Sequence, residues 1–278
     1  MRIAGVGRAI FAVTLIALGL YGLITGHFGA IWEPVPKTLP GRDVLVYLCS
    51  LVALAGGAGL FWRRAALPGV LLVWLLGWML LVTGRFVWLA PLKIGSWENG
   101  AETAVLVAAA WTLYAERASG EGRLGFAGGE RGLGIARTIF GLALVVFGLA
   151  HFAYLELTAP LVPGWLPWHV GWAYFTGGAY IAAGVAVLAG VLPRLAASLA
   201  AVQIGLFTLL VWAPKLAAGS KDPSDWSEAA ISWALTAGAL VVAESYRDKA
   251  WFAVKSGVGG VVGKWRARND SNVRPSDS

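Results

Sequence analysis

Charged residues are scarce in this chain of 278 residues. They make up 13% of the sequence, against a hydrophobic fraction of 58% and a mean hydropathy of +0.70. A soluble helical protein needs polar faces that recur every 3.6 residues. Stretches such as 10–24 and 70–82 have neither a charged residue nor a polar face. The composition therefore excludes a soluble globular domain and predicts an integral membrane protein, with the lipid bilayer as its first partner.

Residue types that carry much of protein chemistry are also few. Cys49 is the only cysteine, so an intramolecular disulfide and a dithiol relay within the chain are both excluded. None of the three histidines has the His-x-x-x-His or Glu-x-x-His spacing of a metal site. There is no glycine-rich phosphate loop, nucleophile elbow or cysteine-rich cluster. No metal is predicted, and no cofactor motif is evident.

The chain contains an internal repeat. Residues 8–11 (RAIF) return as 137–140 (RTIF), 129 positions later. The match continues between 36–40 and 163–167, between 87–91 and 211–214, and between Trp97 and Trp226. Registers shift only in the connections, which indicates a duplicated unit.

Apolar stretches of about 20 residues, the length needed to cross the hydrocarbon as a helix, occur eight times. The predicted spans are 6–26, 43–62, 67–89, 99–117, 136–155, 169–191, 195–214 and 226–245. Because four spans return the chain to its starting side, the two units are expected to have the same orientation. The predicted fold is an all-α integral membrane protein with eight transmembrane helices in two parallel four-helix repeats.

The domain organisation follows from these spans. Residues 1–117 form the first repeat, 118–135 a glycine-rich cytoplasmic linker, and 136–245 the second repeat. The segment 246–278 is a basic tail, which is expected to be disordered towards its end. The first span has a counterpart in the second repeat and is therefore expected to stay in the mature protein and not to be cleaved as a signal.

Lysine and arginine are distributed unequally between the two sides. Sixteen of the 22 lie on the side of both termini and six on the other, so both termini are predicted to be cytoplasmic. The net charge of +7 is thus a signal of topology. No basic folded domain remains that would bind nucleic acid.

The opposite, outer side collects the residues that could form a site. All three histidines and many tryptophans fall at outer span ends or in outer loops. The ordinary interpretations are an aromatic belt for the tryptophans and solvated positions for the histidines. A ligand site, if present, is expected to open on this side.

The second repeat resembles the DoxX-like family of bacterial membrane proteins. The resemblance lies in His151-Phe152, Val162-Pro163, Trp165-Leu166-Pro167, Tyr174-Phe175-Thr176-Gly177 and Ala183-Gly184. It implies a four-helix unit in the bacterial inner membrane, associated with redox complexes and quinone chemistry. The first repeat has Gly22 where the second has His151, so by this resemblance the first repeat is scaffold.

Three functional hypotheses remain from the sequence. The first is a non-catalytic subunit or binding module for a quinone or similar amphiphile. The second is a quinone-linked oxidoreductase subunit, which needs a redox partner protein. The third is a small-solute transporter, against which the spans show no buried ionisable residue and no broken helix. The candidate ligand-binding residues are His151, Tyr174, Trp212, Lys215, His169 and Glu156.

Overall fold

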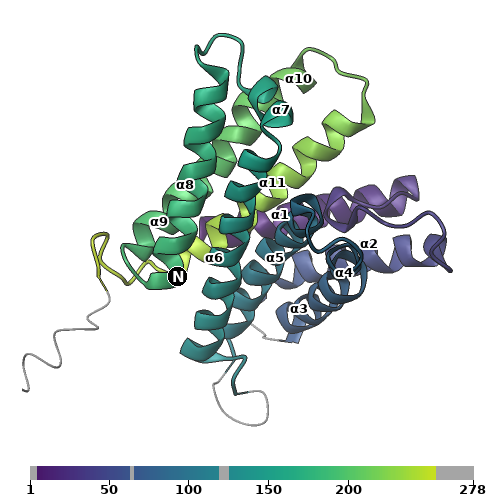
Figure 1. The fold of residues 1–278 in the computed structure, drawn as a ribbon. Coiled ribbons are helices and arrows are strands. Elements are labelled where there is room, and N and C mark those ends of the chain that lie inside the picture. Colours follow the sequence, from purple (N-terminus) through teal and green to yellow (C-terminus); the bar gives the residue numbers. More distant parts are fainter. Residues whose placement is uncertain (1–4, 63–65, 119–124, 255–278) are drawn as a thin grey trace, which may run out of the picture.

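The computed structural model describes residues 5–62, 66–118 and 125–254, which fold as packed helices (Figure 1). The longer helices are α1 (Val6–Thr25), α2 (Arg42–Gly59), α3 (Ala66–Trp78), α4 (Gly84–Leu89), α5 (Ile94–Ala115), α6 (Gly129–Ala153), α8 (His169–Ala189), α9 (Pro193–Phe207), α10 (Ala213–Ala217) and α11 (Pro223–Glu244). Short turns of helix lie between them, namely η1 (Ala30–Trp32), α7 (Leu155–Thr158) and η3 (Ala159–Leu161).

Two long helices contain a π-helical turn. In the first, η2 (Met79–Thr83) joins α3 to α4, and in the second, η4 (Thr208–Trp212) joins α9 to α10. A π turn leaves a local defect in the α-helical hydrogen-bond ladder. Thr83 and Thr208 each donate a hydrogen bond from Oγ1 to the carbonyl oxygen four residues earlier, at 3.0 and 3.2 Å. Each defect is therefore satisfied within its own helix.

Seven of these helices are long and apolar enough to cross a membrane. They are α1, α2, α3 with α4, α6, α8, α9 with α10, and α11. The prediction of an all-helical, multi-pass membrane protein is confirmed at this level for the described part of the chain.

The remaining long helix, α5, lies inside the bundle. Glu98, Asn99 and Glu102 near its start make it more polar than the other seven. More than half of its 22 residues are buried, and α3, α6 and α11 all pack against it. A helix enclosed by protein does not need a lipid-facing apolar surface.

Glycines lie at the contacts of two closely packed helix pairs, α1 with α2 and α6 with α8, which Figure 1 shows running side by side. A Cβ atom on Gly19 would lie 2.6 Å from the backbone nitrogen of Leu54, and one on Gly148 would lie 2.5 Å from the carbonyl oxygen of Gly177. Only glycine lets the two backbones approach this closely. Helices α5 and α11 join the two pairs, with α5 against α6 and α11 against α1.

The ends of several helices meet at one side of the bundle, called here the N/C end. The backbone nitrogen of Gly7 donates to Glu244 Oε1 at 2.7 Å, which ties α1 to α11. Arg137 of α6 donates to Ser245 Oγ at 3.0 Å, and its guanidinium lies 4.2 Å from the ring of Tyr246. Burial raises the pKa of Tyr246 to about 12, although the nearby charge of Arg137 lowers it. The opposite side, where α5 and α11 begin, is called the cavity end.

Some boundaries differ from those predicted. Helix α6 starts at Gly129, seven residues before the predicted span and inside the stretch 118–135 predicted as a linker. Its glycines suggested a loop, but Gly132 is buried, and a Cβ atom there would collide with the backbone of Ala127 and lie 2.9 Å from Ala115 Cβ. Close packing against the preceding turn and the end of α5 therefore explains this glycine. Most of the predicted tail, 255–278, and the linker residues 119–124 lie outside the described residues.

The glycine contacts predict opposite effects for two positions on α8. A Cβ atom on Gly184 would lie 2.6 Å from Gly141 O, whereas one on Gly178 would have nothing within 4 Å. Gly184→Ala should destabilise the protein by about 1–3 kcal/mol through overpacking. Gly178→Ala should stabilise the helix by up to about 1 kcal/mol. Thermal unfolding in detergent measures both, and equal shifts would contradict the close approach of α6 and α8.

Candidate functional site

A cavity of about 160 Å³ lies at the cavity end, between α5, α6, α8, α9 and α11. Its lining combines polar and titratable side chains with apolar walls. The titratable ones are Glu98, Glu102, His151, Tyr180 and Glu228. The walls are Phe147, Leu161, Ile204, Phe207, Trp212, Ile231 and Leu235, and Thr158 and Ser232 add hydroxyl groups. A concave apolar site with a few convergent polar groups is the usual form of a small-ligand pocket.

Three carboxyl groups contribute to this cavity from two helices. Glu98 and Glu102 are four residues apart on α5 and therefore share one face of that helix. Glu228 lies in the second turn of α11. None of the three forms an ion pair with a Lys or Arg among the described residues. The cavity thus gathers three carboxyl groups that neighbouring basic side chains do not contact directly.

His151, at the end of α6, has a defined hydrogen-bonding state. Its Nδ1 lies 2.8 Å from the carbonyl oxygen of Phe147. A carbonyl oxygen only accepts, so Nδ1 carries the proton and Nε2 of the neutral ring is an acceptor. The ring packs 5.3 Å from the buried ring of Tyr180 on α8, which limits its movement.

Three hydroxyl groups form a buried cluster beside the cavity. Thr208 Oγ1 lies 2.6 Å from Ser232 Oγ and 3.3 Å from Thr236 Oγ1. Thr208 is the first residue of the π turn η4, and Ser232 and Thr236 lie one turn apart on α11. The cluster therefore fixes α9 against α11 at the level of the cavity.

Trp212 supplies a donor that the protein does not use. Its side chain is 6% exposed and lines the cavity, and its Nε1 has no hydrogen-bond partner in the described part of the chain. A buried donor without a partner costs about 1–3 kcal/mol. Lys215 Nζ lies 4.6 Å from the Trp212 ring centre and 3.2 Å from Asp225 Oδ1. A cation thus already rests on this indole at the rim of the cavity.

The predicted site residues divide into two groups. His151 and Trp212 line the cavity, and Lys215 lies beside it through its contact with Trp212. The other three lie elsewhere. Tyr174 is 51% exposed and packs 5.7 Å from Phe152. His169 is the first residue of α8, and Glu156 is an exposed residue of α7.

Four titratable lining residues were not among those candidates. They are Glu98, Glu102, Tyr180 and Glu228. The spacing of Glu98 and Glu102 in an otherwise apolar stretch was the available signal, since carboxyl groups inside a bundle are rare without a function. The sequence-based statement that the spans have no buried ionisable residue is wrong, because Glu102 is partly buried in α5. The π turns do not break their helices, which run continuously from Ala66 to Leu89 and from Pro193 to Ala217.

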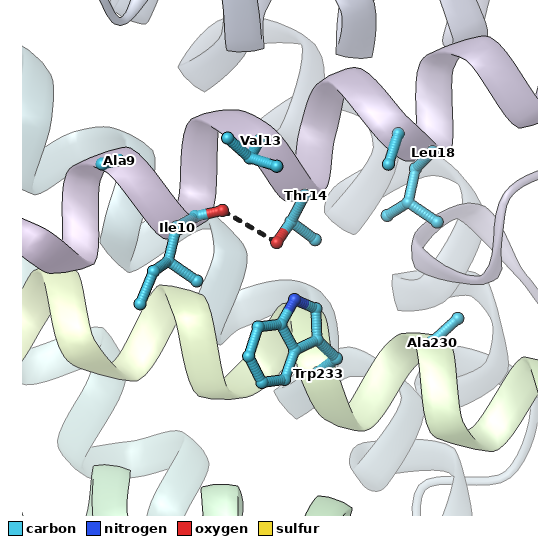
Figure 2. Close-up of a pocket in the computed structure, with 8 residues that line it drawn as sticks. Ala9, Ile10, Val13, Thr14, Leu18, Ala230 and Trp233 are labelled. Atoms are coloured by element: carbon cyan, nitrogen blue, oxygen red, sulfur yellow. Dashed lines mark hydrogen bonds between the residues drawn. The ribbon is translucent and has the colours of Figure 1, made fainter. Parts of the chain in front are cut away.

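A second, larger groove lies between α1 and α11 (Figure 2). It has a volume of about 460 Å³ and is lined by Ala9, Ile10, Val13, Thr14, Ala17, Leu18, Ala230 and Trp233. The hydroxyl of Thr14 already donates to Ile10 O at 2.8 Å, as Figure 2 shows. No charged or titratable side chain lines this groove, so it offers an apolar surface without groups for chemistry.

Neither a metal-binding group nor a known relative points to what the cavity binds. Within residues 5–62, 66–118 and 125–254, no group of three or more His, Cys, Asp or Glu side chains is arranged to hold a metal ion. No family model, no curated protein and no solved structure matches this chain.

The packing around the cavity predicts a pattern of thiol reactivity. Cys49 is fully buried, and a Cys49→Ala background removes it. In that background, Glu228→Cys should react readily with a water-soluble maleimide because residue 228 is exposed at the cavity. Ala237→Cys on the same helix should react only after unfolding, since Ala237 is 0% exposed. Rapid labelling at both positions would contradict the observed packing of α11.

Proposed function

We propose that this chain is a multi-pass membrane protein of the DoxX-like type, built from two parallel four-helix repeats, whose second repeat binds a small amphiphile. In this proposal α5 is the eighth membrane-spanning helix, and the cavity end faces outward. The cavity with its unused Trp212 donor is the observation that carries the proposal.

The repeat is supported by details that recur 129 positions apart. The π turns Met79–Thr83 and Thr208–Trp212 have this offset. So do two indole hydrogen bonds, from Trp97 Nε1 to Pro91 O at 2.9 Å and from Trp226 Nε1 to Ser220 O at 3.0 Å. Each of these bonds joins a tryptophan to a carbonyl six residues earlier, just before the last helix of its repeat. Such matched irregularities are expected of a duplicated unit and not of two unrelated bundles.

The two repeats differ in whether side chains fill the region that forms the cavity in the second repeat. In the first repeat Phe28, Trp32 and Trp78 form a buried aromatic cluster, with ring centres 6.0 and 5.3 Å apart. Trp78 Nε1 donates to Trp32 O at 3.1 Å, whereas Trp32 Nε1 has no partner among the described residues. Trp78 is the counterpart, 129 positions earlier, of the cavity residue Phe207. The first repeat is thus packed as scaffold where the second is hollow.

The titratable lining also differs between the repeats. At an offset of 129, His151 corresponds to Gly22, Glu228 to Asn99, Glu98 to Ser227 and Glu102 to Ile231. Each titratable residue of the cavity therefore has a neutral counterpart. Two of these residues, Glu98 and Glu102, come from α5 of the first repeat, so both repeats contribute to this one cavity. The four neutral counterparts offer no equivalent titratable set.

The polar groups that line the cavity offer both a hydrogen-bond donor and acceptors to an amphiphile. Trp212 Nε1 offers a donor, while His151 Nε2 and the carboxyl oxygens are acceptors. A ligand head that both accepts and donates hydrogen bonds satisfies this set. Within the quinone class, the hydroxyl groups of a hydroquinone do so, and its ring fits between apolar and aromatic walls. The family resemblance supports the same class.

A redox subunit is the second candidate, favoured by the state of His151. Its Nε2 is suited to accept a proton from a hydroquinone hydroxyl as the hydroquinone is oxidised. The two electrons would pass to a partner protein, because the chain has no redox cofactor motif of its own. Copurification of such a partner in a constant ratio would favour this candidate over a simple binding module.

The orientation is supported by the distribution of charge at the N/C end. Helices α1, α6 and α11 meet there through Gly7, Glu244, Arg137 and Ser245, and the basic residues of the sequence collect on that side. By the positive-inside rule this end is cytoplasmic in a bacterial inner membrane.

Thiol labelling of intact cells tests this orientation. In a Cys49→Ala background, Glu156→Cys at the cavity end should react with a membrane-impermeant reagent in right-side-out spheroplasts. Gly134→Cys, exposed near the start of α6, should react only after permeabilisation. The reverse pattern would place the cavity on the cytoplasmic side.

The bound ligand itself tests the proposed function. Protein purified gently from native membranes should carry a stoichiometric amphiphile that is detectable by mass spectrometry of a solvent extract. The amount should fall in His151→Ala, because the cavity loses its acceptor, and it should persist in His169→Ala, a histidine outside the cavity. Recovery of bulk phospholipid alone from all three proteins would remove the binding proposal.

A further inference from the structure

We propose that the head of this amphiphile is an organic ammonium ion with a neighbouring hydrogen-bond acceptor, held by Glu98, Glu102 and Glu228. The inference rests on the proposed binding function and names the chemical class of its ligand. Four features of the cavity carry it: charge, aromatic walls, the position of Lys215, and the unused indole donor.

Charge is the first feature. Three carboxyl groups line one small cavity, and none is paired with Lys or Arg among the described residues. Ionised carboxylates in a partly apolar site need a positive partner, since charges removed from water are costly without one. A hydroquinone donates hydrogen bonds but brings no charge, whereas an ammonium ion brings both.

Aromatic rings supply the second feature. Phe147, Tyr180, Phe207 and Trp212 line the cavity, and the first two pack edge to face at 5.9 Å. Aromatic faces attract cations through their quadrupole, and cages of such rings are used to hold ammonium ligands. The same walls accept the alkyl part of an amphiphile.

The third feature is Lys215, whose ammonium group lies at the rim of the cavity. Its ammonium lies over the Trp212 ring and pairs with Asp225, and Ser220 donates a further hydrogen bond to that carboxylate at 2.7 Å. Lys215 also lies close enough to Glu228 for its charge to act on that carboxyl group. The protein's own ammonium group thus occupies the rim in the way that a ligand's ammonium group would occupy the interior.

The unused donor adds a requirement to the ligand. An ammonium group cannot accept a hydrogen bond, so it leaves Trp212 Nε1 without a partner. An oxygen acceptor next to the amine, as in an alkylated amino alcohol, would satisfy both the carboxylates and the indole. A carboxylate or phosphate head would instead add a further acidic group beside the three glutamates and bring no positive charge.

Probe ligands that differ only in the head group test this inference. Binding of 1-hexanol, hexylammonium and N-hexylethanolammonium is measured by calorimetry on the full chain in an uncharged maltoside detergent. Hexylammonium should bind about tenfold or more tightly than hexanol, as expected for a desolvated charge pair. The added hydroxyl of the third probe should tighten binding further.

Matched variants identify the residues responsible. Glu102→Gln and Glu228→Gln should each remove most of the preference for ammonium over alcohol. Glu156→Gln, which changes an exposed acid at the same end of the bundle but outside the cavity, should retain it. Glu98→Gln provides a third cavity variant if one of the others does not fold, and thermal unfolding establishes folding for each.

The outcomes separate the two proposals. Equal or tighter binding of hexanol, or of a short-chain hydroquinone, would overturn the ammonium assignment and leave the amphiphile site standing. A preference for ammonium that persists in all the cavity variants would also overturn it. Failure of every probe and of the hydroquinone to bind would overturn both proposals.

Discussion

The absence of water from the hydrocarbon region is the constraint on which this structure depends. Each backbone N–H and C=O group that faces lipid must find its partner within its own helix, which explains why the described chain is built of long helices. Departures from the α-helical ladder are tolerated only where the freed groups are satisfied. The threonines at η2 and η4 do this by bonding carbonyls of their own helices. In α9, this defect brings Thr208 and Trp212 to the place where the cavity forms.

The same constraint explains the composition of α5. A helix that faces lipid cannot carry several polar residues, whereas one surrounded by α3, α6 and α11 can. Helix α5 therefore combines a polar start, with Glu98 and Glu102, and a long buried apolar remainder from Ala101 onwards. Its central position lets it present these carboxyl groups to a cavity formed mainly by the following four helices. The two halves of the molecule are thus connected through the candidate site as well as through their packing.

Much of the architecture could be predicted from the sequence because hydrophobic length is a direct physical requirement of a membrane helix. The positions of the long helices, including α5, follow from it to within a few residues at most ends. The start of α6 did not, because a glycine that serves close packing, such as Gly132, has the same appearance in sequence as one that serves a loop. The π turns were also missed, since the residues Met79–Thr83 and Thr208–Trp212 are ordinary apolar helix formers.

The candidate site could be predicted only in part. His151 and Trp212 were found because they are polar or aromatic residues at a span end. Tyr174, His169 and Glu156 share those properties but lie outside the cavity, since the face of the helix on which a residue falls depends on packing. Glu98, Glu102 and Glu228 were not chosen, because the sequence does not show that α5 and α11 bring them to the same cavity.

In the proposed arrangement of two repeats, duplication of a bundle offers a physical route to a binding site. Two equivalent packing regions are not both needed as cavities, and one can be filled to stabilise the whole. Burying a large aromatic side chain contributes about 1.5–3 kcal/mol in water-based estimates, and in lipid the gain comes from close packing. In the first half Phe28, Trp32 and Trp78 fill this region, and Trp78 donates to Trp32 O, although Trp32 Nε1 itself has no partner among the described residues. In the second half Phe207 stands at the position of Trp78, and the nearby indole of Trp212 lines the cavity without a partner in the described part of the chain. The stability of the filled region allows one cavity to keep three carboxyl groups, two from α5 and one from α11, together with an unpaired donor.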